Sequence, residues 1–244
     1  PCFSWTSELR LRIARFPNPD FIMPRDIAFS TFLKLVELDK PRKLSMLKGF
    51  LRGGGFNYWR PLQTLSEEII KGELDFENLT QKMDVFAKGH QKKYNQNALI
   101  KILAWKSKRT AVPRKRPEKF FLKFGNSDFR IRFDPELSFS LNGTEYFAHV
   151  WATNTPSLEE NTISIGLYAL KKAMIENNYK NKHAMIIDTI KDKNFGEFDI
   201  LANAKDMFLY QSHLVDDLWD VANQQSKSSE KTGGDIHAPP PALN

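Results

Sequence analysis

Over the first half of the chain, apolar side chains recur every three or four residues, which is the spacing of one face of an α-helix. The stretches with this spacing are 24–38, 41–51, 58–71, 76–88 and a segment around 99–105, and most of them end at a proline or a glycine. Ahead of them, residues 7–15 alternate apolar and charged side chains, which predicts a strand. We therefore expect a mainly helical unit over residues 1–112.

From about residue 118 the apolar side chains no longer recur at helical spacing but at every second residue. The preceding segment, 110–117, is rich in proline and basic residues and is predicted to be a linker. Residues 129–133 and 137–141 alternate in the manner of strands, and a third strand is predicted over 145–152. Between the last two lies Asn142-Gly143, a pair that tolerates the positive φ angles of a two-residue hairpin turn. The sequence therefore predicts a β-hairpin here.

The remaining sequence adds helices and buried strands. It predicts helices over 163–177 and 206–222, a strand covered on both faces at 184–187 and another strand within 195–200. From residue 223 the content of Ser, Lys, Gly and Pro is typical of disorder. We predict an α+β or α/β protein in three parts: the helical unit 1–112, a mixed sheet with flanking helices over 113–222, and a disordered tail over 223–244.

Composition narrows the class of protein. With 41% hydrophobic residues, the 244-residue chain can fill a genuine core. Its single cysteine, Cys2, excludes an intrachain disulfide framework and a cysteine-rich metal site, so a reducing, cytoplasmic location is expected. The sequence contains no run of about 18 apolar residues, so it predicts no membrane span. Because the chain opens with Pro1 rather than Met, we expect it to continue a longer protein whose first part is missing.

Positive charge is concentrated in residues 87–117, called the basic segment below. It contains ten Lys and Arg and no Asp or Glu, whereas the whole chain carries a formal charge of +7. A localised basic face is what a polyphosphate partner selects. The residues expected to contact phosphates are Lys88, Lys92, Lys93, Lys106, Lys108, Arg109, Arg114, Lys115 and Arg116. Tyr94 and Trp105 could stack on bases, although a place in the core is the simpler expectation for both.

The function preferred from the sequence is non-catalytic, sequence-nonspecific binding of nucleic acid, which needs no cofactor. The alternative interpretation of the same segment is a solvated helix face that runs into a linker. A protein partner, including the missing N-terminal part, is a further class, and exposed aromatic side chains on the helical unit would favour it.

The predicted hairpin also brings three chemically active side chains together. A two-residue turn pairs Leu141 with Thr144, and counting outward places Glu136 opposite His149 and Asp134 two residues further along the same face. Two carboxylates and an imidazole could hold a divalent metal that activates water for phosphodiester cleavage. The simpler alternative is a wet sheet face that carries a charge pair. The sequence leaves open whether the chain is an enzyme.

The order hairpin, long strand, helix and buried strand over residues 118–190 resembles the core of the PD-(D/E)XK nuclease superfamily, particularly its RecB-like members. In that family an acid opens the second strand, a Glu-x-Lys motif lies on the third, and a Gln-x-x-x-Tyr motif often marks the next helix. The resemblance places the opening acid at Asp134 or Glu136. It implies a metal-dependent nuclease using Mg or Mn, which is the alternative function.

The chain departs from the family at the other motifs. The Glu-x-Lys positions hold His149-Val150-Trp151, and the Gln-x-x-x-Tyr positions run from Ser164 to Tyr168, so that only the tyrosine is kept. Trp151 cannot orient a nucleophile as the family's lysine does. The resemblance therefore implies lost catalysis, an altered site supported by His149, or coincidence. The helical part also resembles uncharacterised bacterial proteins with a similar Phe-Leu-Arg-Gly-Gly-Gly stretch.

Overall fold

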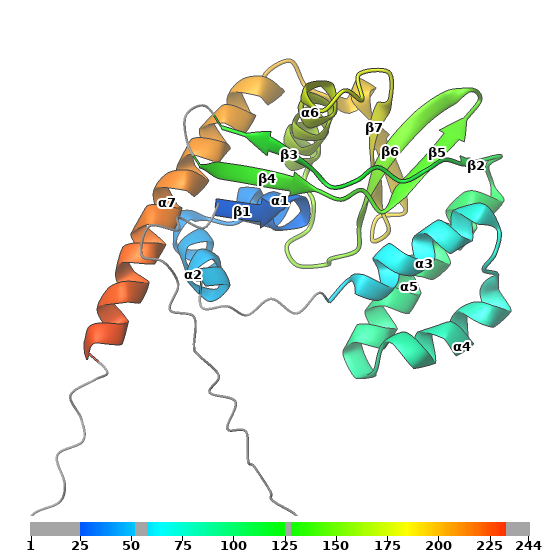
Figure 1. Cartoon of the computed structure of the whole chain (residues 1–244), viewed down its shortest axis with the longest axis horizontal. Helices are drawn as coiled ribbons and strands as arrows, with labels where there is room; N and C mark the ends of the chain where they lie inside the picture. Colours follow the sequence, from blue (N-terminus) through cyan, green and yellow to red (C-terminus); the bar gives the residue numbers. More distant parts are fainter. Residues whose placement is uncertain (1–24, 52–57, 125–127, 233–244) are drawn as a thin grey trace, which may run out of the picture.

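The computed structural model describes residues 25–51, 58–124 and 128–232, and the fold is α+β (Figure 1). Mixed sheets are flanked by helices, as the sequence predicted. The strand predicted at 7–15 and the tail beyond residue 232 lie outside the described residues. Within the described ranges, no helix is both long and apolar enough to cross a membrane.

A five-stranded sheet forms the centre of the molecule (Figure 1). Its strands, in spatial order, are β2 (Val112–Pro113), β5 (Leu137–Leu141), β6 (Thr144–Trp151), β7 (His183–Asp188) and β8 (Lys193–Gly196). Strands β6 and β7 are parallel and are joined by helix α6 (Glu160–Glu176), whereas the other neighbours are antiparallel. The predicted hairpin is confirmed, with Asn142 and Gly143 at φ angles of 49° and 80°.

Strand β2 corrects the predicted linker at 110–117. Val112 and Pro113 pair with Ser140 and Phe139, and the backbone N–H of Arg114 donates to the carbonyl oxygen of Ser138 at 3.0 Å. A proline is tolerated there because β2 is the edge strand of the sheet. The segment is therefore part of the sheet rather than a free connection.

A second sheet has three strands, β1 (Arg25–Ala28), β4 (Phe129–Phe133) and β3 (Phe120–Lys123), in that order. The sequence predicted a helix from residue 24, but residues 25–28 form β1, parallel to β4. The guanidinium of Arg130 donates two hydrogen bonds, of 2.6 and 2.7 Å, to the carboxylate of Asp26 opposite it. This cross-strand pair and the full burial of Ile27 favour the extended conformation over the helix.

Two hydrophobic cores lie on opposite faces of the five-stranded sheet. Along β6, Phe147 and Trp151 belong to the first core, and Ala148 and Val150 belong to the second. Helices α1 (Phe29–Glu37), α2 (Lys40–Leu51), α6 and α7 (Ala204–Thr232) contribute to the first, and α3 (Arg60–Lys71), α4 (Phe76–Phe86) and α5 (Gly89–Ser107) to the second. The helices predicted over residues 24–108 are thus divided between the cores, while the unit boundary at 112 stays a prediction.

Two helix ends differ from the prediction. Helix α5 begins at Gly89, well before the apolar stretch around 99–105 from which it was predicted. Its first turns were missed because they are polar and exposed and so lack an apolar pattern. Helix α7 continues to Thr232, so residues 223–232 are helical where disorder was expected. These ten residues lack the Gly and Pro that follow from position 233, which explains why the helix can continue.

Helix α6 packs closely against both helix α1 and the five-stranded sheet. A Cβ on Gly166 would lie 2.8 Å from Leu33 Cδ2 of α1 and 3.1 Å from Ile186 Cδ1 of β7. A larger residue at this position would have to push these two side chains aside, so glycine fits the close approach of α6 to both neighbours. The first turn of α1 is thereby fixed near the end of β6, where the candidate site lies.

Candidate functional site

A cavity of about 410 Å³ lies where the end of β6 meets the first turns of α1 and α3. Its volume falls within the range of small-molecule sites. The charged side chains in its wall are Lys34, Lys119, Arg132, Asp134 and Glu136, and the aromatic ones include Phe50, Tyr58 and Trp59. Cations, carboxylates and aromatic rings from segments far apart in the sequence therefore meet at one place.

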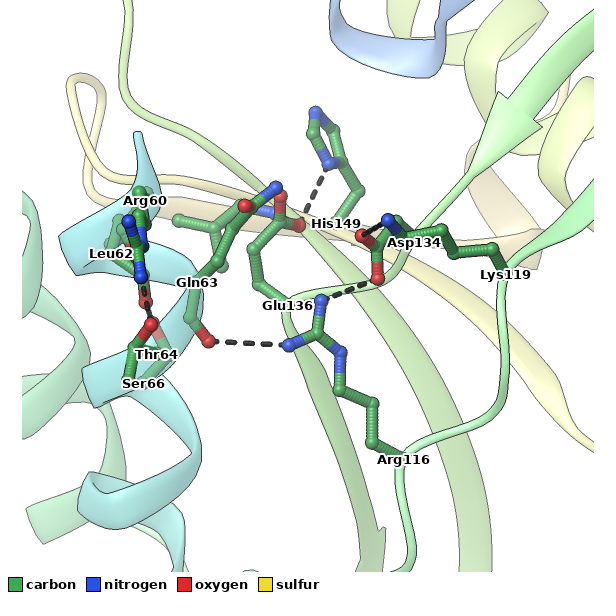
Figure 2. A network of polar contacts seen from close by, with 11 residues as sticks. Arg60, Leu62, Gln63, Thr64, Ser66, Arg116, Lys119, Asp134, Glu136 and His149 are labelled. Atoms are coloured by element: carbon green, nitrogen blue, oxygen red, sulfur yellow. Dashed lines mark hydrogen bonds and ion pairs between the residues drawn. The ribbon is translucent and has the colours of Figure 1, made fainter. Parts of the chain in front are cut away.

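Glu136 and His149 form a buried pair at this cavity (Figure 2). Glu136 is 5% exposed and His149 is 6% exposed. The carboxylate oxygen Oε2 accepts hydrogen bonds from His149 Nδ1 and from the backbone N–H of Val150, both at 2.9 Å. The pairing of Leu141 with Thr144, predicted from the hairpin, is confirmed and carries Glu136 to its place opposite His149.

The environment of Glu136 keeps its carboxyl group ionised. Burial acts to raise the pKa, but the electrostatic attraction of His149 and the hydrogen bonds from His149 and Val150 outweigh it, so the pKa of Glu136 lies below its ordinary value. Because a carboxylate only accepts hydrogen bonds, Nδ1 of His149 carries the proton that it donates. The Glu136 carboxylate thereby fixes the orientation of the imidazole ring.

The other ring nitrogen of His149, Nε2, points away from Glu136 (Figure 2) and is buried without a hydrogen-bond partner among the described residues. The ring of Phe29, from the first turn of α1, packs edge-on against the imidazole with centroids 4.9 Å apart. An imidazole oriented in this way by a carboxylate can accept a proton or ligate a metal through its second nitrogen.

Asp134 is held by cations rather than by the histidine (Figure 2). Arg116 Nη2 lies 2.5 Å from its carboxylate and Lys119 Nζ lies 3.8 Å away. Arg116 also donates a hydrogen bond of 3.3 Å to the carbonyl oxygen of Gln63 on α3. The end of the basic segment thus reaches the cavity wall.

The three predicted metal-site candidates all line the cavity, but the structure joins two of them only, Glu136 and His149. Throughout the described ranges, no group of three or more His, Cys, Asp or Glu side chains is arranged to hold a metal ion. The residues present therefore do not form a ready metal centre.

Elsewhere in the basic segment, acids from outside the segment pair with several of the cations. The pairs are Lys92 with Asp84, Lys101 with Asp192 at 3.7 Å, and Arg114 with Glu145 at 2.9 Å. Arg109 lies over the ring of Trp105, 4.9 Å from its centroid, and donates to Asn194. The basic segment contains no acidic residue, but acidic side chains of other elements lie against it in the fold. These acids lower the net charge around the segment.

Other cations of the segment have no ion pair with a described residue. Lys88, Lys93, Lys108 and Lys115 are exposed, and Lys106 is half-buried. Of the two aromatic candidates, Trp105 is 7% exposed in the second core, as expected. Tyr94 is 41% exposed beside His90, so the expectation that it belongs to the core is wrong. Its place on the polar first half of α5 explains the difference.

Sequence reasoning missed three cations in the cavity wall, Lys34 of α1, Lys119 just before β3 and Arg132 of β4. Lys34 is half-buried, and burial lowers the pKa of its ammonium group. Among the described residues it has neither an ion pair nor a hydrogen-bond partner. The signal for Lys34 was a lone cation between Leu33 and Leu35 in an apolar stretch, which predicts burial but not a cavity.

The positions that the family resemblance singled out on β6 and α6 have structural contacts. Trp151 is 1% exposed in the first core. Ser164 Oγ accepts a hydrogen bond of 2.8 Å from the backbone of Leu201, and Tyr168 packs against Phe208 with ring centroids 5.4 Å apart. Neither Ser164 nor Tyr168 lines the cavity.

Fold and site together define an α+β protein with a cation-lined cavity and a buried Glu–His pair. Comparisons of the chain with family models, with curated proteins and with solved structures gave no match. The resemblance to PD-(D/E)XK nucleases therefore stays a prediction.

Proposed function

We propose that this protein binds nucleic acid through its phosphate groups, without reading the base sequence. The observation that carries this proposal is the meeting of three cations in the wall of one cavity, with a fourth cation beside it. Lys34 comes from α1, Lys119 from the residue before β3 and Arg132 from β4, and Arg116, at the end of the basic segment, pairs with Asp134 in the same wall. Cations gathered in this way attract phosphates and release the counterions condensed on them.

Exposed lysines of α5 extend the proposed surface. Gln91 and Asn95 of this helix donate hydrogen bonds of 3.1 and 3.0 Å to the carbonyl oxygen of Tyr58, which lines the cavity. The first turns of α5 therefore lie near the cavity, with exposed Lys88 at the N-cap on the same side, whereas exposed Lys93 faces the opposite side of the helix. Lys92 and Arg114 are expected to contribute less, because carboxylates already neutralise them.

We expect a steep dependence of binding on salt. With about four phosphate contacts to a single strand, the affinity falls about 50-fold between about 50 and about 200 mM salt. Fluorescence anisotropy with labelled single- and double-stranded DNA and RNA measures this change. Lys205→Gln, at an exposed lysine outside the cavity wall, is the matched control and should leave the affinity unchanged. Binding that does not respond to salt would contradict phosphate recognition.

A second candidate is phosphodiester hydrolysis, and the buried Glu136–His149 pair favours it. Strands β4, β5 and β6, then α6 and β7, follow one another in the order that suggested a PD-(D/E)XK-like core. Trp151 cannot supply the cation of the Glu-x-Lys motif, but Lys34 lines the same cavity and can. On this candidate, His149 supports an altered site.

Cleavage tests the second candidate separately from binding. We expect the wild-type chain to shorten labelled oligonucleotides on a denaturing gel in Mg²⁺ or Mn²⁺ but not in EDTA, and His149→Ala to lose at least 100-fold in rate, the usual size of a lost acid–base contribution. His183→Ala, at an exposed histidine outside the cavity, is the control. Binding without any cleavage would remove hydrolysis and leave the binding proposal in place.

A further inference from the structure

Resting on the proposed function, we propose that the cavity holds one nucleotide unit, with its base on Tyr58 and Trp59 and its phosphate on Lys34 and Arg132. The ligand class is a nucleoside phosphate, either free or as a unit of a single strand.

The aromatic part of the site lies at the start of α3. The rings of Tyr58 and Trp59 are 5.0 Å apart and meet edge to face at 76°, and both residues are half-buried rather than enclosed in a core. Phe50, 41% exposed at the end of α2, lines the same cavity. Aromatic faces at a cavity wall offer bases a stacking surface that every base can use.

The cationic part of the site lacks an anion. Lys34 has lost part of its hydration, and no carboxylate among the described residues compensates for this loss, which is why burial lowers the pKa of its ammonium group. A phosphate beside Lys34 and Arg132 would restore a counter-charge. Residues 28–31 also line the cavity, so the N–H groups in the first turn of α1 add positive potential there.

The carboxylates in the wall do not oppose an anionic ligand. Asp134 is neutralised by Arg116 and Lys119, and Glu136 accepts hydrogen bonds from His149 and Val150. With the two acids engaged, Lys34 and Arg132 are the charges left to act on a phosphate in the cavity.

The size of the cavity decides which form of nucleic acid fits. A volume of about 410 Å³ admits one nucleotide but not a stacked duplex. A base must therefore leave its stack to enter, which costs little in a single strand and several kcal/mol in a duplex. The inference thus commits to single strands, strand ends and unpaired nucleotides over regular duplex.

The test measures the affinity of the full chain for labelled single-stranded oligo-dT and oligo-U and for a duplex of equal length, in a salt series. We expect Trp59→Ala to weaken single-strand binding about 10-fold with an unchanged salt slope, and Trp59→Phe to retain most of the affinity. Lys34→Gln should instead reduce the slope of log affinity against log salt by about 0.7. Phe198→Ala, at a fully exposed phenylalanine outside the cavity, is the control.

Each outcome separates this inference from the proposed function. The nucleotide site would be overturned if the chain bound single strand and duplex equally well and if neither Trp59→Ala nor Lys34→Gln changed the affinity. Phosphate binding by another part of the surface would then remain as the proposed function. Failure to bind any nucleic acid would overturn both. Competition with AMP and UMP distinguishes the two sources: displacement of the oligonucleotide supports a free nucleotide, and its absence alongside the variant effects supports a strand.

Discussion

Replacing Glu136 by Ala is expected to lower the free energy of unfolding by about 2 to 6 kcal/mol, because it removes the acceptor of two buried hydrogen-bond donors, each worth about 1 to 3 kcal/mol when left unsatisfied. Two hydrogen-bond donors, His149 Nδ1 and the N–H of Val150, would lose their acceptor, and Glu136 and His149 are only 5% and 6% exposed. Urea unfolding followed by circular dichroism measures the change. Glu118→Ala, at an exposed glutamate, is the matched control and should cost less than about 0.5 kcal/mol.

The same carboxylate makes stability depend on pH in a defined direction. The folded-state pKa of Glu136 is lowered from 4.5, so the ionised group contributes stability that is fully present above the unfolded pKa and is lost as pH falls through the folded pKa. Glu136→Gln retains an acceptor but not the charge, and its stability should fall less than that of wild type below pH 4.5. Parallel pH profiles for the two proteins would contradict this assignment.

The buried pair could be predicted because its geometry follows from local chemistry. Asn142-Gly143 fixes the length of the turn, and from there the pairing is a matter of counting to Glu136 and His149. What counting could not show was the covering of this face by α1, which converts an expected wet surface into a buried one. That covering depends on the close approach of α6 at Gly166, a tertiary contact with no local signal.

The basic segment shows the opposite case. Its freedom from acids is a fact of the sequence, but charges interact through space, and the carboxylates that neutralise it come from separate elements. Glu145 lies 31 residues beyond Arg114, and Asp134 lies 18 beyond Arg116. Strand β1 likewise pairs with β4 about a hundred residues away, with Arg130 opposite Asp26 at a separation of 104. No periodicity within one segment can reveal such partners.

Charge reversal at the cavity is expected to have the largest effect on binding. In the double variant Lys34→Glu and Arg132→Glu, two carboxylates would face the phosphate, and like charges in contact cost several kcal/mol, so the single-strand affinity should fall more than about 100-fold. Anisotropy at low salt measures the loss, and thermal unfolding checks that the variant is folded.

A second double variant, Lys88→Glu and Lys93→Glu, makes the comparison decisive. These lysines are exposed at the start of α5 and lie outside the cavity wall, so their reversal should act mainly through long-range attraction and weaken binding less, with a loss that largely disappears as salt is added. The cavity variant should stay impaired at high salt, because direct contacts in a partly buried site are poorly screened. If the α5 variant has the larger and more persistent effect, the phosphates lie along the helix, as the charge pattern of the sequence first suggested, and the cavity is not the centre of the interface.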